Sequence, residues 1–295
     1  DISPYLKLGG NTIAALVHNV GEGLHHRMNG KGGFFFQSKI IDSEEKIIKL
    51  KTDKSWLVAK AIAWDSKTDH RQIDHTIGRQ EKYDARLAYD GWELNHFNDS
   101  NWENATEIGV PPIDPWNKIV VINRERTFFK NITPERKWIR NGLHIYDFGK
   151  AITAYPRFVA NSSESGLTFE IGTAETLGKD SIPLTTDNVN YIDFYITKKG
   201  LQSWNPITWR SFRYMAIKEN KEVKIENVSA EFRSFPVNNR GYFLCSDSML
   251  NDIWEIGRWS MQICAQDTWM DTPWREQTQY IAGDSRYMLR YSAYG

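Results

Sequence analysis

Apolar and polar residues alternate along much of the first 237 positions, and this spacing predicts β-strands. Successive side chains of a strand point to opposite faces, so a half-buried strand alternates in this way. The clearest runs are residues 145–150, 167–172 and 191–196, where aromatic and β-branched side chains are also frequent. Residues 204–217 continue the pattern. We therefore predict a mainly β chain up to about residue 237.

Shorter runs near the N-terminus predict further strands. Residues 12–17 form an apolar run after a Gly-Gly-Asn turn, which is typical of a buried strand. Residues 47–53 predict a second strand, which runs to the edge of the sheet near Trp56. Residues 1–17 resemble the middle of a sugar-binding-like jelly roll, and this resemblance implies that earlier strands precede them.

A proline-rich segment separates two β regions. Residues 111–116 hold three prolines in five positions, which cannot sustain a helix or a central strand. The predicted domains are therefore residues 1–110 and 111–237, followed by a helical region over residues 238–295.

The pattern changes to helical spacing after residue 246. Apolar positions then recur three or four residues apart, as on one face of an amphipathic helix over residues 247–266. They are Leu250, Ile253, Trp254, Gly257, Met261 and Cys264. Ser246 or Asp247 is the predicted N-cap, and Trp254 and Trp259 are predicted to be core residues rather than ligand contacts.

A second helix is predicted to follow, with Asp284 as its cap. Tyr287, Met288 and Tyr291 begin its apolar stripe. An amphipathic helix pair must bury its apolar face against another element. We therefore expect these helices to belong to a larger helical architecture, unless a partner chain covers them.

Composition narrows the classes of partner. The 295 residues carry 37 basic and 37 acidic side chains, which favours neither nucleic acid nor an anionic membrane as a partner. No apolar run approaches the roughly 18 residues needed to span a bilayer. Twelve Trp, thirteen Tyr and fourteen Phe are compatible with carbohydrate binding, although most aromatic side chains serve cores.

Cysteine and histidine add little chemistry. The predicted helix would separate Cys245 from Cys264 by roughly 25 Å at 1.5 Å per residue, too far for a disulfide, so both are predicted to be free thiols. His25 and His26 are adjacent and would point to opposite faces of a strand, which favours a surface loop over a metal site. No cofactor is predicted, and scattered Asp and Asn residues leave a structural calcium open.

Candidate chemistry gathers in residues 271–284. Three acids and one arginine lie there beside two aromatic residues: Asp271, Glu276, Asp284, Arg275, Trp274 and Tyr280. Carboxylates accept hydroxyl hydrogen bonds strongly, and a pair of carboxylates is what glycoside hydrolysis requires. A capped, solvated loop after a helix is the alternative interpretation.

The run Asp-x-Pro-x-Arg-Glu followed by Gly-Asp resembles the signature of the bacterial α-L-rhamnosidases, glycoside hydrolase family 78. Residues 80–105 and residues 145–217 are similar to this family's accessory domain and β-sandwich. The resemblance implies two β-sandwich or jelly-roll domains followed by the first helices of an (α/α)6 barrel. In residues 80–105 a structural role is favoured over sugar binding.

The resemblance also implies hydrolysis of terminal α-L-rhamnosides with inversion. It assigns the general acid to Glu276 and substrate binding to Asp271, Arg275, Asp284 and Trp274, with helix capping as the competing role of Asp284. A general acid needs a raised pKa, which Trp274 would favour and Arg275 would oppose. Trp274 stands where Gln is commoner, and Gln277 stands where some members carry a second acid.

The general base is expected after residue 295, so residues 1–295 alone are predicted to be inactive. The expected partner is a rhamnosylated carbohydrate in bacterial polysaccharide degradation, with the oligomeric state left open. A periplasmic or secreted location is expected, and a cytoplasmic one remains open. A non-catalytic carbohydrate-binding module and a structural β-sandwich region remain as alternatives, and Glu175 is predicted to be a solvated acid at a strand end rather than a cleft residue.

Overall fold

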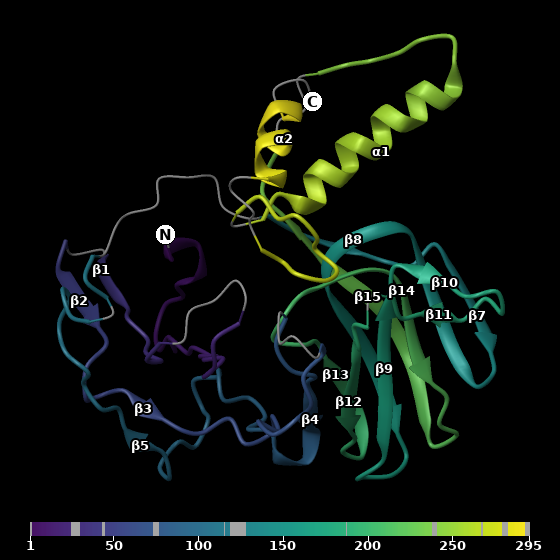
Figure 1. Cartoon of the computed structure of the whole chain (residues 1–295). Helices are drawn as coiled ribbons and strands as arrows, with labels where there is room; N and C mark the ends of the chain where they lie inside the picture. The colour runs from purple at the N-terminus through teal and green to yellow at the C-terminus, as the bar shows by residue number, and fades with distance from the viewer. Residues whose placement is uncertain are drawn as a thin grey trace. The chain divides into compact units, whose positions relative to one another are not determined.

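The computed structural model describes the chain except for residues 1, 25–29, 43–44, 73–76, 115, 119–127, 187, 238–240, 267, 279–282 and 293–295. His25 and His26 lie outside the described residues. By its described residues the chain forms two compact units (Figure 1). The first comprises Asp1–Glu22, Asn29–Ile62 and Leu87–Ile122, and the second comprises Gly23–Met28, Ala63–Arg86 and Asn123–Gly295.

The first unit has little regular structure. It contains a 3-10 turn η1 (Ser3–Tyr5), an antiparallel pair of β1 (Gln37–Ile41) and β2 (Ile47–Lys51), and a short pair of β3 (Leu57–Val58) and β5 (Glu103–Asn104). Edge-to-face aromatic contacts hold its loops together, including Trp102 with Phe97 at 5.6 Å between ring centroids.

The strand predicted over residues 12–17 is wrong. No described residue pairs with this segment, and Leu16 and Val17 are about half exposed. A strand needs a neighbour for its backbone N–H and C=O groups, so an apolar run alone does not make one. The strand expected over residues 47–53 is confirmed as β2.

One nine-stranded sheet dominates the second unit. Its path is β4-β12-β9-β14-β8-β15-β6, with β7 and β13 also paired to β8. The strands are β4 (Lys82–Asp84), β6 (Phe128–Ile132), β7 (Arg136–Arg140), β8 (Leu143–Ser162), β9 (Thr168–Ala174), β12 (Ile192–Ile196), β13 (Gly200–Trp204), β14 (Arg210–Lys218) and β15 (Val223–Ser234). Three short elements complete the unit: η2 (Ala85–Leu87), β10 (Thr176–Leu177) and β11 (Pro183–Leu184).

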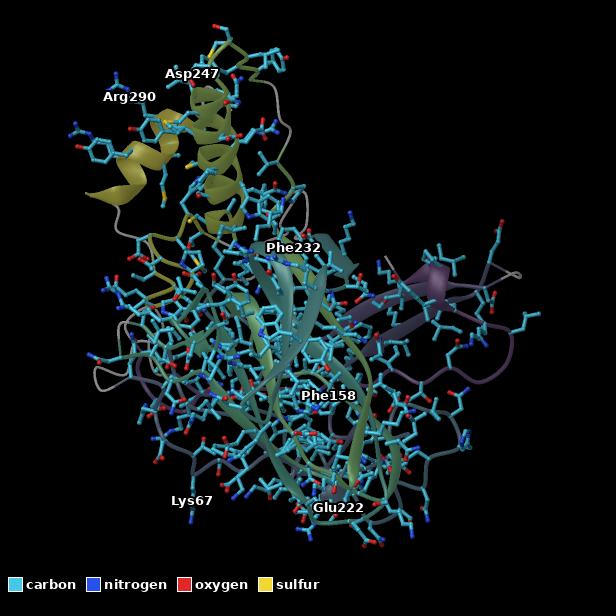
Figure 2. All side chains as sticks on the ribbon, turned by 90° about the vertical axis from the view of Figure 1, so that its right-hand side faces the viewer. Lys67, Phe158, Glu222, Phe232, Asp247 and Arg290 are labelled. Carbon is cyan, nitrogen blue, oxygen red and sulfur yellow. The ribbon has the colours of Figure 1, made fainter. Side chains whose placement is uncertain are left out.

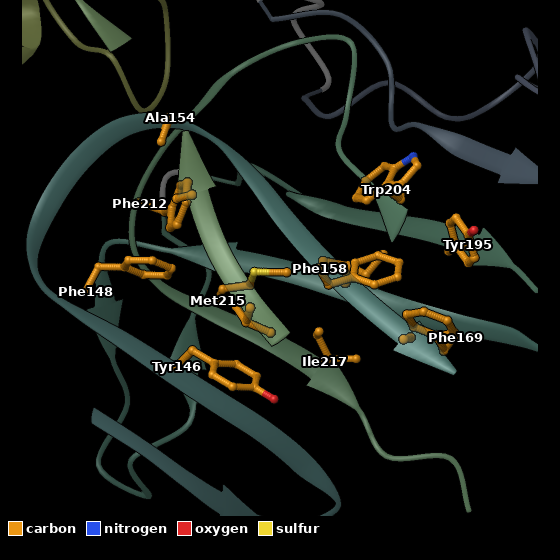
Figure 3. Packing of buried hydrophobic residues seen from close by; sticks show 14 of the residues in the cluster. Tyr146, Phe148, Ala154, Phe158, Phe169, Tyr195, Trp204, Phe212, Met215 and Ile217 are labelled. Atoms are coloured by element: carbon orange, nitrogen blue, oxygen red, sulfur yellow. The ribbon is translucent and has the colours of Figure 1, made fainter. Parts of the chain in front are cut away.

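The long strand β8 shapes this sheet. Its first half pairs with β7 and β14, and its second half pairs with β13 and β15. Inward-pointing side chains of both halves therefore meet in one core (Figure 3). Phe158 lies 5.1 Å from Tyr195 between ring centroids, and Phe148 lies 5.5 Å from Phe212. The predicted mainly β fold is confirmed.

Two details of the strands differ from the sequence prediction. Residues 204–217 are not one element, because β13 ends at Trp204 and β14 begins at Arg210, with Pro206 between them unable to donate a ladder hydrogen bond. The sequence also did not predict that β4 pairs in parallel with β12 of the sandwich.

The predicted first helix is confirmed as α1 (Ser248–Cys264). Asp247 is its N-cap and accepts a hydrogen bond from the Met249 N–H at 2.9 Å. Near its other end, Trp259 donates to the Ala151 carbonyl at 2.7 Å and stacks on Phe232 of β15 at 5.6 Å between ring centroids. Figure 2 labels Asp247 at the start of α1 and Phe232 in the sheet. Trp259 thus has the core role that the sequence predicted.

Much of the apolar stripe of α1 remains uncovered in this chain. Leu250 and Ile253 are 48% and 58% exposed, and Trp254 packs only on Phe243 among the described ring contacts, at 5.8 Å. Cys245 and Cys264 are both free and lie at opposite ends of the helix.

The second predicted helix is α2 (Asp284–Tyr291). Its N-cap is Gly283, so the prediction that Asp284 is the cap was wrong by one position. Asp284 is instead the first helical residue, and its side chain lies outside what the structure describes. Tyr287 and Tyr291 are both more than half exposed.

Candidate functional site

Residues 271–278 form a loop that closes on itself after α1. The Asp271 N–H donates to the Thr278 carbonyl at 3.0 Å, and the N–H groups of Glu276 and Gln277 both donate to the Thr272 carbonyl. Gln277 ends this single helical turn in a left-handed conformation with φ of 54°. We call residues 271–278 the acid loop. Its own hydrogen bonds fix where each of its side chains leaves the backbone.

The acid loop contains four of the predicted site residues, and two of them form an ion pair. Arg275 Nη2 lies 2.9 Å from Glu276 Oε1, with the two side chains 42% and 19% exposed. Asp271 is half-buried at the start of the loop, and its Oδ2 accepts from the Thr272 hydroxyl at 3.3 Å. Glu276 is therefore neither enclosed in the core nor fully in solvent, which a residue that donates a proton to a substrate requires.

Trp274 is buried in the sheet-bearing unit. It is 3% exposed and lies in a small buried cluster with Ala174, Val189 and Tyr191. Its ring centroid is 4.7 Å from that of Tyr191, whose hydroxyl donates to the Trp274 carbonyl at 2.7 Å. The structure assigns Trp274 a packing role beneath the acid loop, and its predicted contact with substrate stays a prediction.

The chain between α1 and the acid loop is anchored to the sandwich (Figure 1). Gln266 is 3% exposed and its Nε2 donates to the Thr153 hydroxyl and the Ile263 carbonyl, both at 2.9 Å. The Phe235 N–H donates to the Ala265 carbonyl at 2.8 Å. The acid loop thus starts from a fixed point on β8 and the end of β15.

A buried charge network lies under Tyr191, and sequence reasoning missed it. Arg71, Arg210 and Asp193 are each at most 3% exposed. Asp193 accepts from both guanidiniums, with Arg210 Nη2 at 2.9 Å from Oδ2. Arg210 also lies 3.2 Å from Glu81. These residues stand far apart along the chain, and no local pattern marks them as partners.

Glu175 is not the solvated acid that the sequence predicted. It directly follows β9, is half-buried, and accepts a hydrogen bond from the Ser211 hydroxyl at 2.5 Å. Burial, together with the nearby charges of Asp271 and Glu175, raises the pKa of the Cys264 thiol to about 12.

Within the described ranges, no group of three or more His, Cys, Asp or Glu side chains is arranged to hold a metal ion. A structural calcium stays a prediction. No helix in the described part of the chain is both long and apolar enough to cross a membrane.

Comparison with known protein families gives three matches in chain order. The α-L-rhamnosidase N-terminal domain matches residues 1–122, the bacterial α-L-rhamnosidase concanavalin-like domain matches residues 137–233, and the bacterial α-L-rhamnosidase 6 hairpin glycosidase domain matches residues 238–294. The acid loop lies in the last of these.

Individual relatives agree with these matches. An α-L-rhamnosidase of Formosa agariphila is 26% identical over 248 residues, covering 78% of this chain and 25% of the relative. An α-L-rhamnosidase of an Alteromonas species is 24% identical over 275 residues, covering 88% and 28%. The chain thus spans about a quarter of the length of these curated relatives.

Two solved structures share the fold. The α-L-rhamnosidase from Dictyoglumus thermophilum superposes with a TM-score of 0.66 at 25% identity, over 82% of this chain and 27% of that one. The Streptomyces avermitilis α-L-rhamnosidase complexed with L-rhamnose gives a TM-score of 0.67 at 20% identity, over 82% and 23%. The three consecutive domain matches, the last of them a 6 hairpin glycosidase domain, give the class as glycoside hydrolases. The chain belongs to the bacterial α-L-rhamnosidases, glycoside hydrolase family 78.

Proposed function

We propose that the full-length protein is an α-L-rhamnosidase that removes terminal α-L-rhamnose from a rhamnosylated carbohydrate with inversion. One observation carries the proposal: the acid loop, inside the six-hairpin domain match, holds Arg275 and Glu276 as an accessible pair. Both curated relatives named above are α-L-rhamnosidases, which supports the same substrate class.

In the proposed mechanism Glu276 is the general acid. It protonates the glycosidic oxygen while the bond to the anomeric carbon breaks, so that the aglycone leaves as a neutral alcohol. Its 19% exposure gives a substrate access, and its anchored loop limits the positions it adopts. An inverting reaction also needs a carboxylate base about 6.5–9.5 Å away to activate water. None of the described residues is assigned that role.

Asp271, Arg275 and Asp284 are the proposed substrate-binding residues. A carboxylate accepts from sugar hydroxyls and a guanidinium donates to them, and charge-assisted hydrogen bonds of this kind are stronger than neutral ones. Asp271 and Arg275 are both accessible enough to do so, since each is only half-buried. Asp284 is included on its place in the sequence motif.

The test is substrate selectivity and product stereochemistry. We expect the full-length protein to hydrolyse an aryl α-L-rhamnoside and to leave aryl α-L-fucoside and aryl β-D-glucoside intact. Proton NMR during the reaction should show β-L-rhamnose first, with the α anomer appearing by mutarotation. Hydrolysis of the other glycosides alone would contradict the substrate class, and initial release of the α anomer would contradict inversion.

A further inference from the structure

A buried hydrogen bond attaches the acid loop to the residue that directly precedes β12. The Tyr191 hydroxyl donates to the Trp274 carbonyl at 2.7 Å, although the two residues are 83 positions apart. That carbonyl belongs to the peptide bond that leads directly into Arg275. A hydrogen bond at this carbonyl therefore fixes the orientation of the Trp274–Arg275 peptide plane, from which the backbone continues to Glu276.

Tyr191 is itself held on all sides. Its ring lies near two guanidinium groups, with Arg71 at 5.1 Å and Arg210 at 5.6 Å from the ring centroid, and it is 3% exposed. Its carbonyl accepts from the Thr173 N–H of β9 at 3.1 Å. Tyr191 thus has little freedom to follow a moving loop.

The two arginines are fixed in turn by buried partners. Arg71 and Arg210 both pair with Asp193, which lies two residues after Tyr191. Arg71 also brackets the preceding residue, because its carbonyl accepts from the Asn190 N–H at 2.8 Å and its Nη1 donates to the Asn190 carbonyl at 3.3 Å. The support beneath Tyr191 is therefore ionic and buried, and it comes from Asp193 and Arg210 of the sheet together with Arg71.

We propose that Tyr191 is a positioning residue for the proposed rhamnosidase reaction. Its hydroxyl holds the Trp274–Arg275 peptide so that Glu276 meets the glycosidic oxygen in the orientation needed for proton transfer. This inference rests on the proposed function. If Tyr191 has this role, the β-sandwich domain contributes to catalysis, because one of its side chains orients Glu276 of the following domain.

A misplaced general acid slows hydrolysis most for substrates whose leaving group must be protonated in order to depart. Misplacing a catalytic group by about 1 Å costs on the order of 100-fold in rate. An activated aglycone such as 4-nitrophenol leaves as a stable anion and depends less on protonation than phenol does. A change in the orientation of the Glu276 carboxyl group should therefore lower kcat for the phenyl substrate far more than for the nitrophenyl substrate.

The experiment compares full-length wild type, Tyr191→Phe and the control Tyr146→Phe on phenyl and 4-nitrophenyl α-L-rhamnosides. Tyr146 is a buried tyrosine of β8 in the main core (Figure 3). We expect Tyr191→Phe to lose roughly 10- to 100-fold in kcat on the phenyl substrate, with a much smaller loss on the other and little change in KM. Tyr146→Phe should lose equally little on both.

Equal, small losses of Tyr191→Phe on both substrates would overturn the positioning role while leaving the proposed function intact. A wild type that hydrolyses neither substrate would overturn the proposed function and the catalytic role of Tyr191 with it. Hydrogen exchange of the wild type provides a readout that needs no variant. Peptides from residues 271–278 should be protected like those of β14, and exchange as fast as in α2 would contradict a held loop.

Discussion

Arg275 and Glu276 are sequence neighbours whose side chains also form an ion pair, with 2.9 Å between Nη2 and Oε1. Neighbouring side chains on a helical turn do not normally face each other, so the long arginine side chain must bend back to make this contact. The pair remains accessible, because the Arg275 side chain is 42% exposed. Its contribution to folding is correspondingly small, since exposed ion pairs are worth about 0–1 kcal/mol.

Replacing Arg275 should therefore affect activity and not stability. We expect Arg275→Met to lower kcat/KM on an aryl α-L-rhamnoside by roughly 10- to 100-fold, which corresponds to about 1.4–2.7 kcal/mol of charge-assisted binding. The free energy of unfolding should change by less than about 1 kcal/mol. Arg258→Met is the matched control, because Arg258 also pairs with a nearby glutamate, Glu255 at 2.7 Å on α1. Wild-type kcat/KM in Arg275→Met would contradict a role for this side chain in substrate binding.

Asp193 should behave in the opposite way. It is the shared partner of two buried guanidiniums, and removing one member of a buried ion pair costs about 3–5 kcal/mol. We expect Asp193→Asn to lower the free energy of unfolding, measured by urea denaturation, by an amount in this range. Glu231→Gln is the control, because Glu231 pairs with Arg157 at a partly exposed site and should cost about 1 kcal/mol or less. Equal losses of unfolding free energy in the two variants would show that the buried network under Tyr191 does not stabilise the fold by about 3–5 kcal/mol.

Stability should also fall in acid through Asp147. Burial alone would raise its pKa, but hydrogen bonds from Arg213, the Gly149 N–H and Arg136 outweigh burial and lower the pKa to about 2. A carboxylate with a lowered pKa stabilises the fold above its unfolded pKa of about 3.9, and this stabilisation is lost as the pH falls toward 2. Its size is about 2 kcal/mol.

Urea unfolding at pH 5 and pH 2.5 measures this effect. Wild type should lose more stability between the two values than Asp147→Asn does, because the variant has no carboxylate to protonate. Parallel losses in both proteins would assign acid sensitivity to other groups.

Local patterns predicted the elements that depend on local physics. The N-cap at Asp247 and the three- and four-residue spacing after it predicted α1, and residues 191–196 predicted β12, which starts at Ile192. The acid loop was found because its acids and arginine are close in sequence. The strand predicted over residues 12–17 failed because an apolar run does not say whether a pairing neighbour exists.

The support of the acid loop could not be predicted in this way. Arg71, Asp193 and Arg210 appear in the sequence as ordinary charges, and only the fold turns them into a buried network. Tyr191 looked like a strand residue, and its hydrogen bond to Trp274 spans 83 positions. Trp274 was predicted to contact sugar because the sequence does not show its burial, which depends on packing against the distant Tyr191.

The central claim is that Glu276 donates the proton to the leaving group. Full-length wild type, Glu276→Gln and the control Glu255→Gln would be compared on phenyl α-L-rhamnoside, whose leaving group needs protonation. Glu255 is an exposed glutamate of α1 that pairs with Arg258. We predict that Glu276→Gln loses about 10²–10⁴-fold in kcat while Glu255→Gln retains wild-type activity. Equal turnover by wild type and Glu276→Gln would contradict the assignment of Glu276 as the general acid.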